Sequence, residues 1–154
     1  MKKNILGVTL ARGGSKGIKN KNLANIHGKP LIYYTIKEAK KSKKITNYII
    51  STDSIKIKKV AQKYNAQVPF IRPKKFSKDN SSSASALKHA LIESEKIYNK
   101  KFDYVIELMA TNPLKSSKDI DNIIKILLKN KADSVIAVNQ LFDNHPARIK
   151  KIVN

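Results

Sequence analysis

The sequence predicts an α/β protein, built as a three-layer αβα sandwich around a mostly parallel sheet. Short apolar runs alternate along the chain with segments in which apolar residues recur at helical spacing. The first run, residues 5–11, is apolar almost throughout, which is typical of a strand buried on both faces of a parallel sheet. Strand and helix repeats of this kind connect by right-handed crossovers and cover both faces of the sheet with helices.

The first half of the chain supplies the first strands and helices of this pattern. Strands are predicted at residues 5–11, 48–53 and 67–71, and helices at 30–41 and 54–64. Pro30 stands in the first turn of its helix, where the missing N–H costs nothing. The strand at 48–53 begins with apolar residues and ends in polar ones, as expected where a strand enters a loop.

The second half continues the alternation. We expect helices at 82–98 and 117–130 and strands at 102–109 and 133–138. The helix at 117–130 is entered through Ser116 and Ser117, which suit a helix N-terminus. The tail 139–154 completes no further strand and helix unit, and within it 144–152 has the pattern of a turn followed by a short extended segment. With 154 residues, the chain fits a single domain.

The composition limits the classes of function. The chain has no cysteine, so disulfides, zinc–thiolate clusters and thiol nucleophiles are excluded, and a reducing compartment suits it. No segment approaches the roughly 18 apolar residues that a membrane-spanning helix needs, and the N-terminal apolar run is too short for a signal peptide. We therefore expect a soluble, cytoplasmic protein with no membrane partner.

The net charge of +21 raises the possibility of a nucleic-acid partner. The chain is rich in lysine, asparagine and isoleucine, which is what an AT-rich genome encodes, and its aromatic residues do not interleave with basic ones as a stacking platform requires. A basic nucleic-acid-binding domain therefore remains a minor alternative. Arginine is scarce, and Arg12, Arg72 and Arg148 each supply a planar bidentate donor that lysine does not replace.

The loop after the first strand, residues 12–22, is the strongest candidate for a ligand site. Its glycines, Gly13, Gly14 and Gly17, allow positive φ angles, so consecutive N–H groups can form an anion-binding nest. Positive charge comes from Arg12, Lys16, Lys19 and Lys21. The loop matches neither the Walker A pattern nor the dinucleotide fingerprint. Phosphate binding is favoured over a plain surface connection.

Other segments fall where strands should end, on the same rim of the sheet. Arg72 precedes a hydroxyl-rich turn in which Ser81, Ser82 or Ser83 has the properties of a helix cap or a ligand contact. Asp53 is either a cap for the following helix, which is the favoured interpretation, or a metal ligand.

The histidines offer no alternative chemistry. His27, His89 and His145 form neither a metal-binding pair nor a serine-hydrolase motif, so a histidine-based hydrolase is not supported.

Several motifs, in order along the whole chain, resemble those of the acylneuraminate cytidylyltransferases, or CMP-sialic acid synthetases. Pseudaminic and legionaminic acid cytidylyltransferases share the pattern. The motifs are Leu-Ala-Arg-Gly-Gly-Ser-Lys-Gly-Ile at 10–18, Lys21-Asn22, Gly-Lys-Pro-Leu at 28–31, Ser-Thr-Asp at 51–53, Arg72 with Ser-Lys-Asp-Asn-Ser-Ser at 77–82, and Ala-Thr-Asn-Pro at 110–113.

The resemblance implies a Rossmann-like nucleotidyltransferase fold, also known as the nucleotide-diphospho-sugar transferase fold. It implies transfer of CMP from CTP to a nonulosonic acid, with release of pyrophosphate and with Mg²⁺, for building cell-surface polysaccharide. Matched motif by motif, the resemblance implies that Arg12 and Lys21 make the catalytic contacts to the triphosphate. It implies that the nucleotide is bound by Arg12, Gly13, Gly14, Ser15, Lys16, Asn22, Arg72 and Ser81. The residues expected to face the acceptor are Met109, Thr111 and Asn112.

The chain departs from the family pattern in two side chains and in length. Met109 stands where relatives carry glutamine, and Lys115 replaces the usual arginine after Pro-Leu. Family domains continue for about another half of this length, with a dimerisation element and the carboxylates that hold Mg²⁺. We therefore expect residues 1–154 to be one cytidylyltransferase domain without that part, with no metal ligands of its own and with the family's homodimer left open. A non-catalytic nucleotide-binding subunit is the main alternative function.

Overall fold

The computed structural model describes residues 3–15 and 17–138. The elements are β1 (Ile5–Leu10), η1 (Lys21–Leu23), β2 (Asn25–Ile26), β3 (Lys29–Pro30), α1 (Leu31–Lys41), β4 (Asn47–Ser51), α2 (Ile55–Lys63), η2 (Lys74–Phe76), α3 (Ser83–Tyr98), β5 (Tyr104–Glu107) and α4 (Ser117–Lys129). The predicted helices are all present, with ends within one residue of the expected ones. The tail 139–154, with its expected turn and extended segment, lies outside the described residues.

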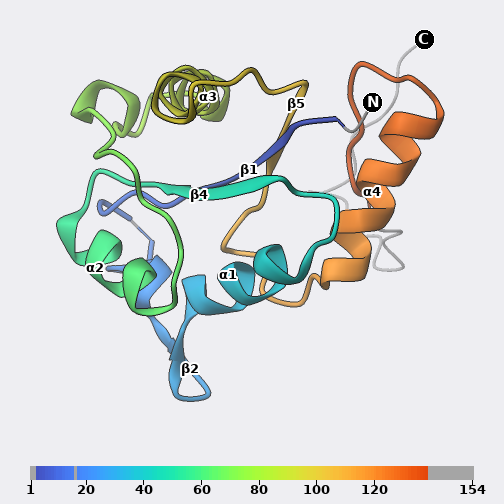
Figure 1. The fold of residues 1–154 in the computed structure, drawn as a ribbon. Coiled ribbons are helices and arrows are strands. Elements are labelled where there is room, and N and C mark those ends of the chain that lie inside the picture. Colours follow the sequence, from blue (N-terminus) through green and yellow to red (C-terminus); the bar gives the residue numbers. More distant parts are fainter. Residues whose placement is uncertain (1–2, 16, 139–154) are drawn as a thin grey trace, which may run out of the picture.

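The main sheet of the described residues is parallel, in the order β4-β1-β5 (Figure 1). Strand β1 pairs with β4 from Leu6 opposite Asn47, and with β5 from Ile5 opposite Tyr104. Because β1 is central, both of its edges are hydrogen-bonded and its carboxyl end lies between the ends of its two neighbours.

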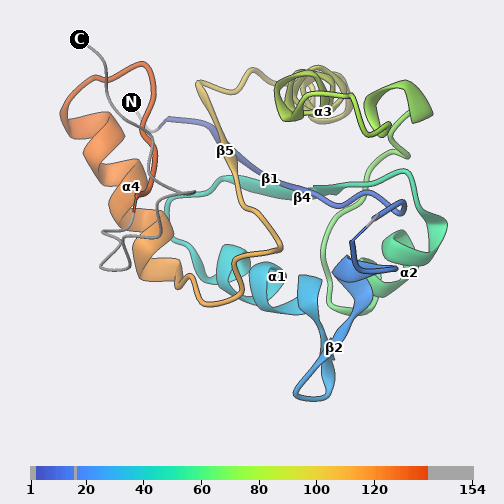
Figure 2. The same ribbon diagram turned by 180° about the vertical axis from the view of Figure 1, so that it is seen from behind.

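Helices cover both faces of this sheet. Helix α3 lies on one face, while α1, α2 and α4 lie on the other, as the two opposite views show (Figures 1 and 2). Side chains of β1 alternate between the faces: Leu6 and Val8 pack with Ala90 of α3, whereas Ile5 packs with Ile120 and the rest of the α4 side. Burial on both faces explains the continuous apolar run, and the predicted α/β sandwich is confirmed.

One buried hydroxyl links the three strands: it belongs to the end of β1 and bonds to the start of β4 and to the residue after β5. Thr9 Oγ1, fully buried in β1, donates to the Leu108 carbonyl just after β5 at 2.8 Å and shares a hydrogen bond with the Tyr48 hydroxyl of β4, also at 2.8 Å. Burial raises the pKa of the Tyr48 phenol. The phenol therefore stays neutral and hydrogen-bonded at the centre of the sheet.

A small hairpin, β2-β3, was not expected from the sequence. Its two central residues, His27 and Gly28, have φ angles of 46° and 77°, as a two-residue type I′ turn requires. The hairpin projects from the body of the domain next to α1 (Figure 1), and the Tyr34 hydroxyl of α1 holds it by donating to the Ile26 carbonyl at 2.6 Å.

Two of the predicted strands are absent from the described structure. Segment 67–71 makes only an isolated parallel bridge, between Gln67 and Ile49 of β4, because Pro69 has no N–H with which to continue the ladder. Segment 133–138 forms no ladder, and its Ile136 and Val138 side chains are 80% and 89% exposed. Both strand predictions were therefore wrong, although 67–71 does run beside the edge of the sheet. No helix of the described residues is long and apolar enough to cross a membrane.

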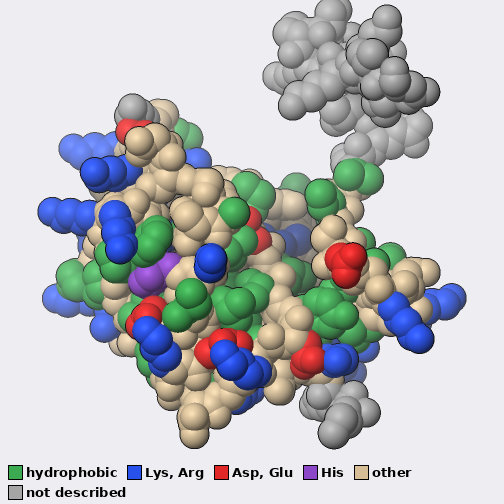
Figure 3. Space-filling model, turned by 90° about the horizontal axis from the view of Figure 1, so that it is seen from above, with side chains coloured by type: hydrophobic (Ala, Val, Ile, Leu, Met, Phe, Trp, Pro, Cys, Tyr) green, Lys and Arg blue, Asp and Glu red, His purple; other side chains and the backbone are tan. Residues whose placement is uncertain are grey.

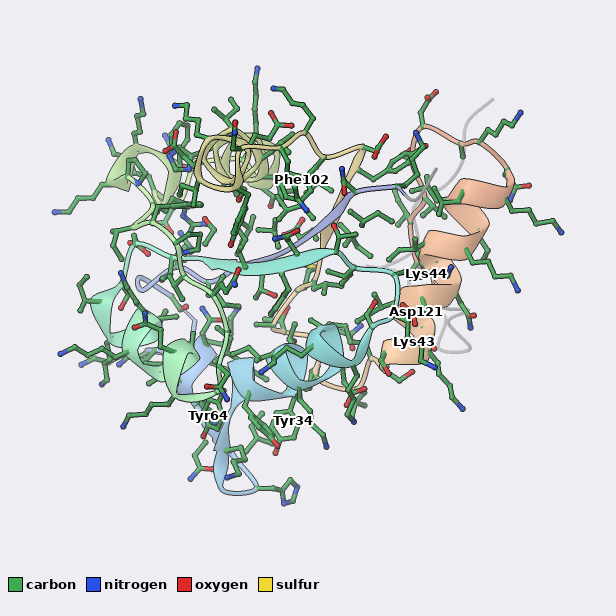
Figure 4. All side chains as sticks on the ribbon, in the orientation of Figure 1. Tyr34, Lys43, Lys44, Tyr64, Phe102 and Asp121 are labelled. Carbon is green, nitrogen blue, oxygen red and sulfur yellow. The ribbon has the colours of Figure 1, made fainter. Side chains whose placement is uncertain are left out.

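Asp121 of α4 fixes the loop between α1 and β4 (Figure 4). Its carboxylate accepts hydrogen bonds from Ser42 Oγ at 2.5 Å and from the backbone N–H groups of Lys43 and Lys44 at 3.1 and 3.2 Å. Desolvation by burial raises the pKa of Asp121, but these hydrogen bonds together outweigh it and hold the pKa below its ordinary value.

We expect Asp121→Asn to lower the free energy of unfolding by about 1 to 2 kcal/mol at neutral pH, because a neutral amide replaces the charged acceptor. The carboxyl pKa is lower in the folded than in the unfolded state. The stabilisation is therefore present above about pH 4 and is lost as the pH falls through the folded value. Denaturant unfolding measured from neutral to acidic pH tests both statements.

The matched control is Asp133→Asn, at an exposed aspartate. It should leave both the neutral stability and the acid profile unchanged. A wild-type acid profile for Asp121→Asn would contradict the role given to this carboxylate.

Candidate functional site

The loops expected to share one rim of the sheet do lie together. The backbone N–H of Ala11, at the end of β1, donates to the Ser51 carbonyl at 3.0 Å. The N–H of Arg72 donates to the Thr52 carbonyl at 2.8 Å. These bonds join the loop after β1, the end of β4 and the segment carrying Arg72 into one continuous edge, with the turn after β5 on the other side of β1.

Asp53 anchors the base of the loop after β1. Its Oδ1 accepts the Gly13 N–H at 2.9 Å, and a Cβ at Gly13 would lie 3.0 Å from the Cβ of Ser54. The favoured interpretation of Asp53 as a helix cap was wrong, because Ser54 caps α2 by accepting the Ile57 N–H. Gly13 is therefore required for close approach between two loops.

Beyond this anchor the loop is open. A Cβ at Gly14 or Gly17 would meet no atom within 4 Å, so the backbone there is accessible to a ligand. Gly13 and Gly14 do not have positive φ angles, and among the described residues of the loop Asn20 is left-handed, at φ 54°. The predicted anion-binding nest stays a prediction. Lys16 lies outside the described residues.

Asn22 is a buried support for the loop. It is the middle residue of η1, and its side-chain amide donates to the Arg12 carbonyl at 3.1 Å. Lys21 precedes it with its side chain half-buried. The structure therefore brings Arg12, Gly13 and Asn22 together, while the predicted contact of Lys21 with a triphosphate stays a prediction.

Two guanidinium groups occupy the rim. Arg12 forms an ion pair with Asp79 at 2.6 Å, with both side chains partly exposed. Arg72 is only 3% exposed, and its Nε donates to Ser77 Oγ at 2.9 Å. Desolvation lowers the pKa of Arg72, the carboxylate of Asp53 raises it, and the guanidinium of Arg12 lowers it, which places all three charges within electrostatic reach of one another.

The serines before α3 have different structural roles. Ser82 caps the helix by accepting the Ser85 N–H at 3.2 Å. Ser81 donates its hydroxyl to the Lys75 carbonyl at 2.9 Å and so closes the turn between η2 and α3. The expectation that one of these serines caps the helix is confirmed, and the nucleotide contact of Ser81 stays a prediction.

The residues expected to face the acceptor lie on the turn after β5. Met109, Thr111 and Asn112 are exposed, and the Asn112 N–H donates to the Met109 carbonyl at 3.2 Å. Lys115 folds back onto this turn, and desolvation lowers the pKa of its ammonium to about 8. Sequence reasoning had identified Lys115 only as a departure from the family pattern.

Two further contacts of the rim were not anticipated. Asp79 and Ser77 lie inside the 77–82 motif, and each binds an arginine. Asp79 is the only acidic residue of that motif, so a search for partners of the scarce arginines would have pointed to it.

The described residues contain no group of three or more His, Cys, Asp or Glu side chains that could hold a metal ion. The rim carboxylates, Asp53 and Asp79, are engaged by Gly13 and Arg12 respectively. This donor set does not fit a Mg²⁺ site.

The basic charge is not gathered into one surface on the α3 face. Figure 3 shows basic side chains mainly around its edge, with acidic side chains beside basic ones. On α3, Lys96 pairs with Glu93 at 2.9 Å, and Lys101, just after the helix, pairs with Glu95 at 2.7 Å. This arrangement is that of solvated helix faces rather than a phosphate-tracking groove.

Comparison with known proteins gives consistent relatives. The chain is 41% identical over 109 residues to the CMP-N,N'-diacetyllegionaminic acid synthase of Campylobacter jejuni, covering 71% of this chain and 46% of that protein. It is 37% identical over 130 residues to the pseudaminic acid cytidylyltransferase of the same species, covering 84% and 56%. The chain thus spans about half the length of the curated relatives that it matches.

The fold has a matching solved structure, that of CMP:2-keto-3-deoxy-manno-octonic acid synthetase complexed with CTP. The TM-score is 0.69 at 20% identity, over 84% of this chain and 49% of that one. The sequence also matches the family model described as Cytidylyltransferase over residues 6–150, almost its whole length. The chain therefore belongs to the cytidylyltransferase family.

Proposed function

We propose that the chain carries the nucleotide-binding and acceptor-facing elements of an enzyme that transfers CMP from CTP to a nonulosonic acid. The observation that carries this proposal is the rim: a loop anchored at Gly13 and open from Gly14 onward, beside the guanidiniums of Arg12 and Arg72. Relatives named for legionaminic and pseudaminic acid support the class of acceptor. The absence of cysteine suits a reaction in the reducing cytoplasm.

In the proposed reaction, the anomeric oxygen of the acid attacks the α-phosphorus, and the bond from that phosphorus to the bridging oxygen of pyrophosphate breaks. The hydroxyl proton leaves to solvent, and negative charge moves to the departing pyrophosphate. Arg12 and Lys21 would lie against the triphosphate and stabilise this charge, while Arg72 and Asn22 would hold the nucleotide. Ser15, Lys16 and Ser81 would complete the nucleotide contacts. The acid would approach from the turn that carries Met109, Thr111 and Asn112.

Mg²⁺ is implied for such reactions as a further source of positive charge. Because the described carboxylates do not fit a metal site, every step assigned here belongs to the chain's own cations and backbone.

The test is incubation of the chain with CTP, Mg²⁺ and N-acetylneuraminic, pseudaminic or legionaminic acid, with release of pyrophosphate and formation of CMP-sugar measured together. Product with at least one acid is the expected result. Binding of CTP without pyrophosphate release would support the nucleotide-binding subunit instead. Binding of short DNA that CTP does not displace would contradict both.

Arg72→Met should weaken CTP binding by about tenfold or more, because a buried guanidinium gives stronger, geometrically fixed hydrogen bonds to phosphate than a solvated cation does. Removing an arginine that is already desolvated should leave thermal stability close to that of the wild type. Calorimetric titration with CTP and a thermal melt provide the two measurements. The control, Lys74→Met, removes the same charge from an exposed neighbour; equal losses in the two variants would show that only net charge matters.

Asp79→Asn should strengthen CTP binding by about two- to fivefold. In the wild type the triphosphate has to replace the partly exposed ion pair between Asp79 and Arg12, and in the variant that pair is absent. Titration with CTP at fixed salt measures the change. Asp103→Asn is the matched control, since Asp103 pairs with Lys3 at 2.8 Å near the amino end of the sheet. Weaker binding in Asp79→Asn would mean instead that Asp79 holds Arg12 in its binding position.

A further inference from the structure

The ammonium of Lys115 is fully hydrogen-bonded within the protein. Its Nζ donates to the Met109 carbonyl at 2.7 Å, to the Asn112 carbonyl at 2.5 Å and to Thr35 Oγ1 at 2.8 Å. An ammonium group has three donors, so none is left for a ligand. Lys115 is therefore bound to the turn after β5 rather than extended into solvent.

These acceptors join the turn to the domain core. Thr35 belongs to α1 and is completely buried, and its own hydroxyl is directed to the Met109 carbonyl at 3.5 Å. The turn is closed by the bond from the Asn112 N–H to the Met109 carbonyl. Through Lys115, the conformation of residues 109–112 is tied to a helix that lies beneath the sheet (Figure 1).

This arrangement partly buries the charge of Lys115, and all of its hydrogen-bond acceptors are neutral oxygens. Desolvation by burial lowers the pKa of Lys115 to about 8. A lysine side chain is long enough to place its charge in water, so a buried ammonium persists only where its hydrogen bonds compensate for the lost hydration. At this position, hydrogen bonds to the turn therefore replace the hydration of the Lys115 ammonium.

The turn directs backbone oxygens toward Lys115 and leaves side chains available outside. The side chain of Met109 is 58% exposed, and Thr111 and Asn112 are exposed as well. We infer that Lys115 is a positioning residue for the acceptor: by holding the turn through Met109 and Asn112, it sets the surface that the nonulosonic acid binds. This inference rests on the proposed function.

The test compares Lys115→Met with Lys118→Met, which removes the same charge from an exposed position on α4. Calorimetry measures the binding of CTP, and then of each of the three acids to the CTP-saturated protein without divalent metal. We expect Lys115→Met to weaken acid binding by about tenfold while CTP binding stays within about twofold. Lys118→Met should change neither.

Lys115→Arg restores a cation with several donors and should return acid binding to within about threefold of the wild type. Thr35→Val keeps the ammonium and removes one of its acceptors, so it tests the same contact if Lys115→Met does not fold. We expect about threefold weaker acid binding for Thr35→Val, again with CTP binding unchanged.

The outcomes separate this inference from the proposed function. If no acid binds the wild type, the proposed function fails and the inference falls with it. If acid binds the wild type and Lys115→Met equally, the inference alone is overturned. Parallel losses of CTP and acid affinity in Lys115→Met would also overturn it, since they would show a general structural role.

Discussion

The hydroxyl of Thr9 is the interaction on which the site geometry depends. It lies fully buried in the central strand, bonded to the Tyr48 hydroxyl on one side and to the Leu108 carbonyl on the other. The loop after β1 leaves the sheet close to Thr9, and the turn after β5 begins at Leu108. Loss of this hydroxyl would leave the Leu108 carbonyl and the Tyr48 phenol without this hydrogen-bond partner. Such a loss inside the protein lowers stability more than loss of an exposed hydrogen bond does. The loop after β1 and the turn after β5 are thus tied together inside the core.

Each of the two rim arginines lies near a carboxylate before any ligand binds. Arg12 faces Asp79, and Arg72 lies within the field of Asp53. The two arginines differ in the free energy needed for an anionic ligand to bind beside them. The Arg12 pair is partly exposed, so replacing its carboxylate by phosphate costs on the order of 1 kcal/mol or less. Arg72 is already desolvated and oriented by Ser77, so little reorganisation remains when an anion arrives. A partly exposed outer cation and a buried inner one suit successive capture and orientation of a polyanion.

Local patterns predicted those parts of the fold whose causes are local. The helices and the buried first strand follow from apolar spacing, and serines at 54, 82 and 116 provide the caps. The errors had both local and distant causes. Pro69, within the 67–71 segment, ends the ladder although the other residues suit a strand, and the 133–138 run has no strand beside it in the described structure. Asp53 was assigned to the helix next to it because its partner, Gly13, is forty positions away and meets it only through sheet pairing. Motif matching found the rim arginines, but not the carboxylate and hydroxyl that hold them.

The nucleotide and acceptor sides of the rim are held by different means. The loop from Arg12 to Asn22 is fixed at both ends by contacts to uncharged groups or to a carboxylate, so its shape survives changes in any one cation. The turn after β5 is held by the Lys115 ammonium, which reaches two of its carbonyls, and by the Asn112 N–H and the Thr35 hydroxyl, both directed to the Met109 carbonyl. A substitution at Lys115 therefore removes two hydrogen bonds from the turn, whereas a substitution at Arg72 removes a charge together with the hydrogen bond to Ser77. On the proposed function, substitutions at Lys115 act on acceptor binding and substitutions at Arg72 act on nucleotide binding, because the two residues support different segments of the rim.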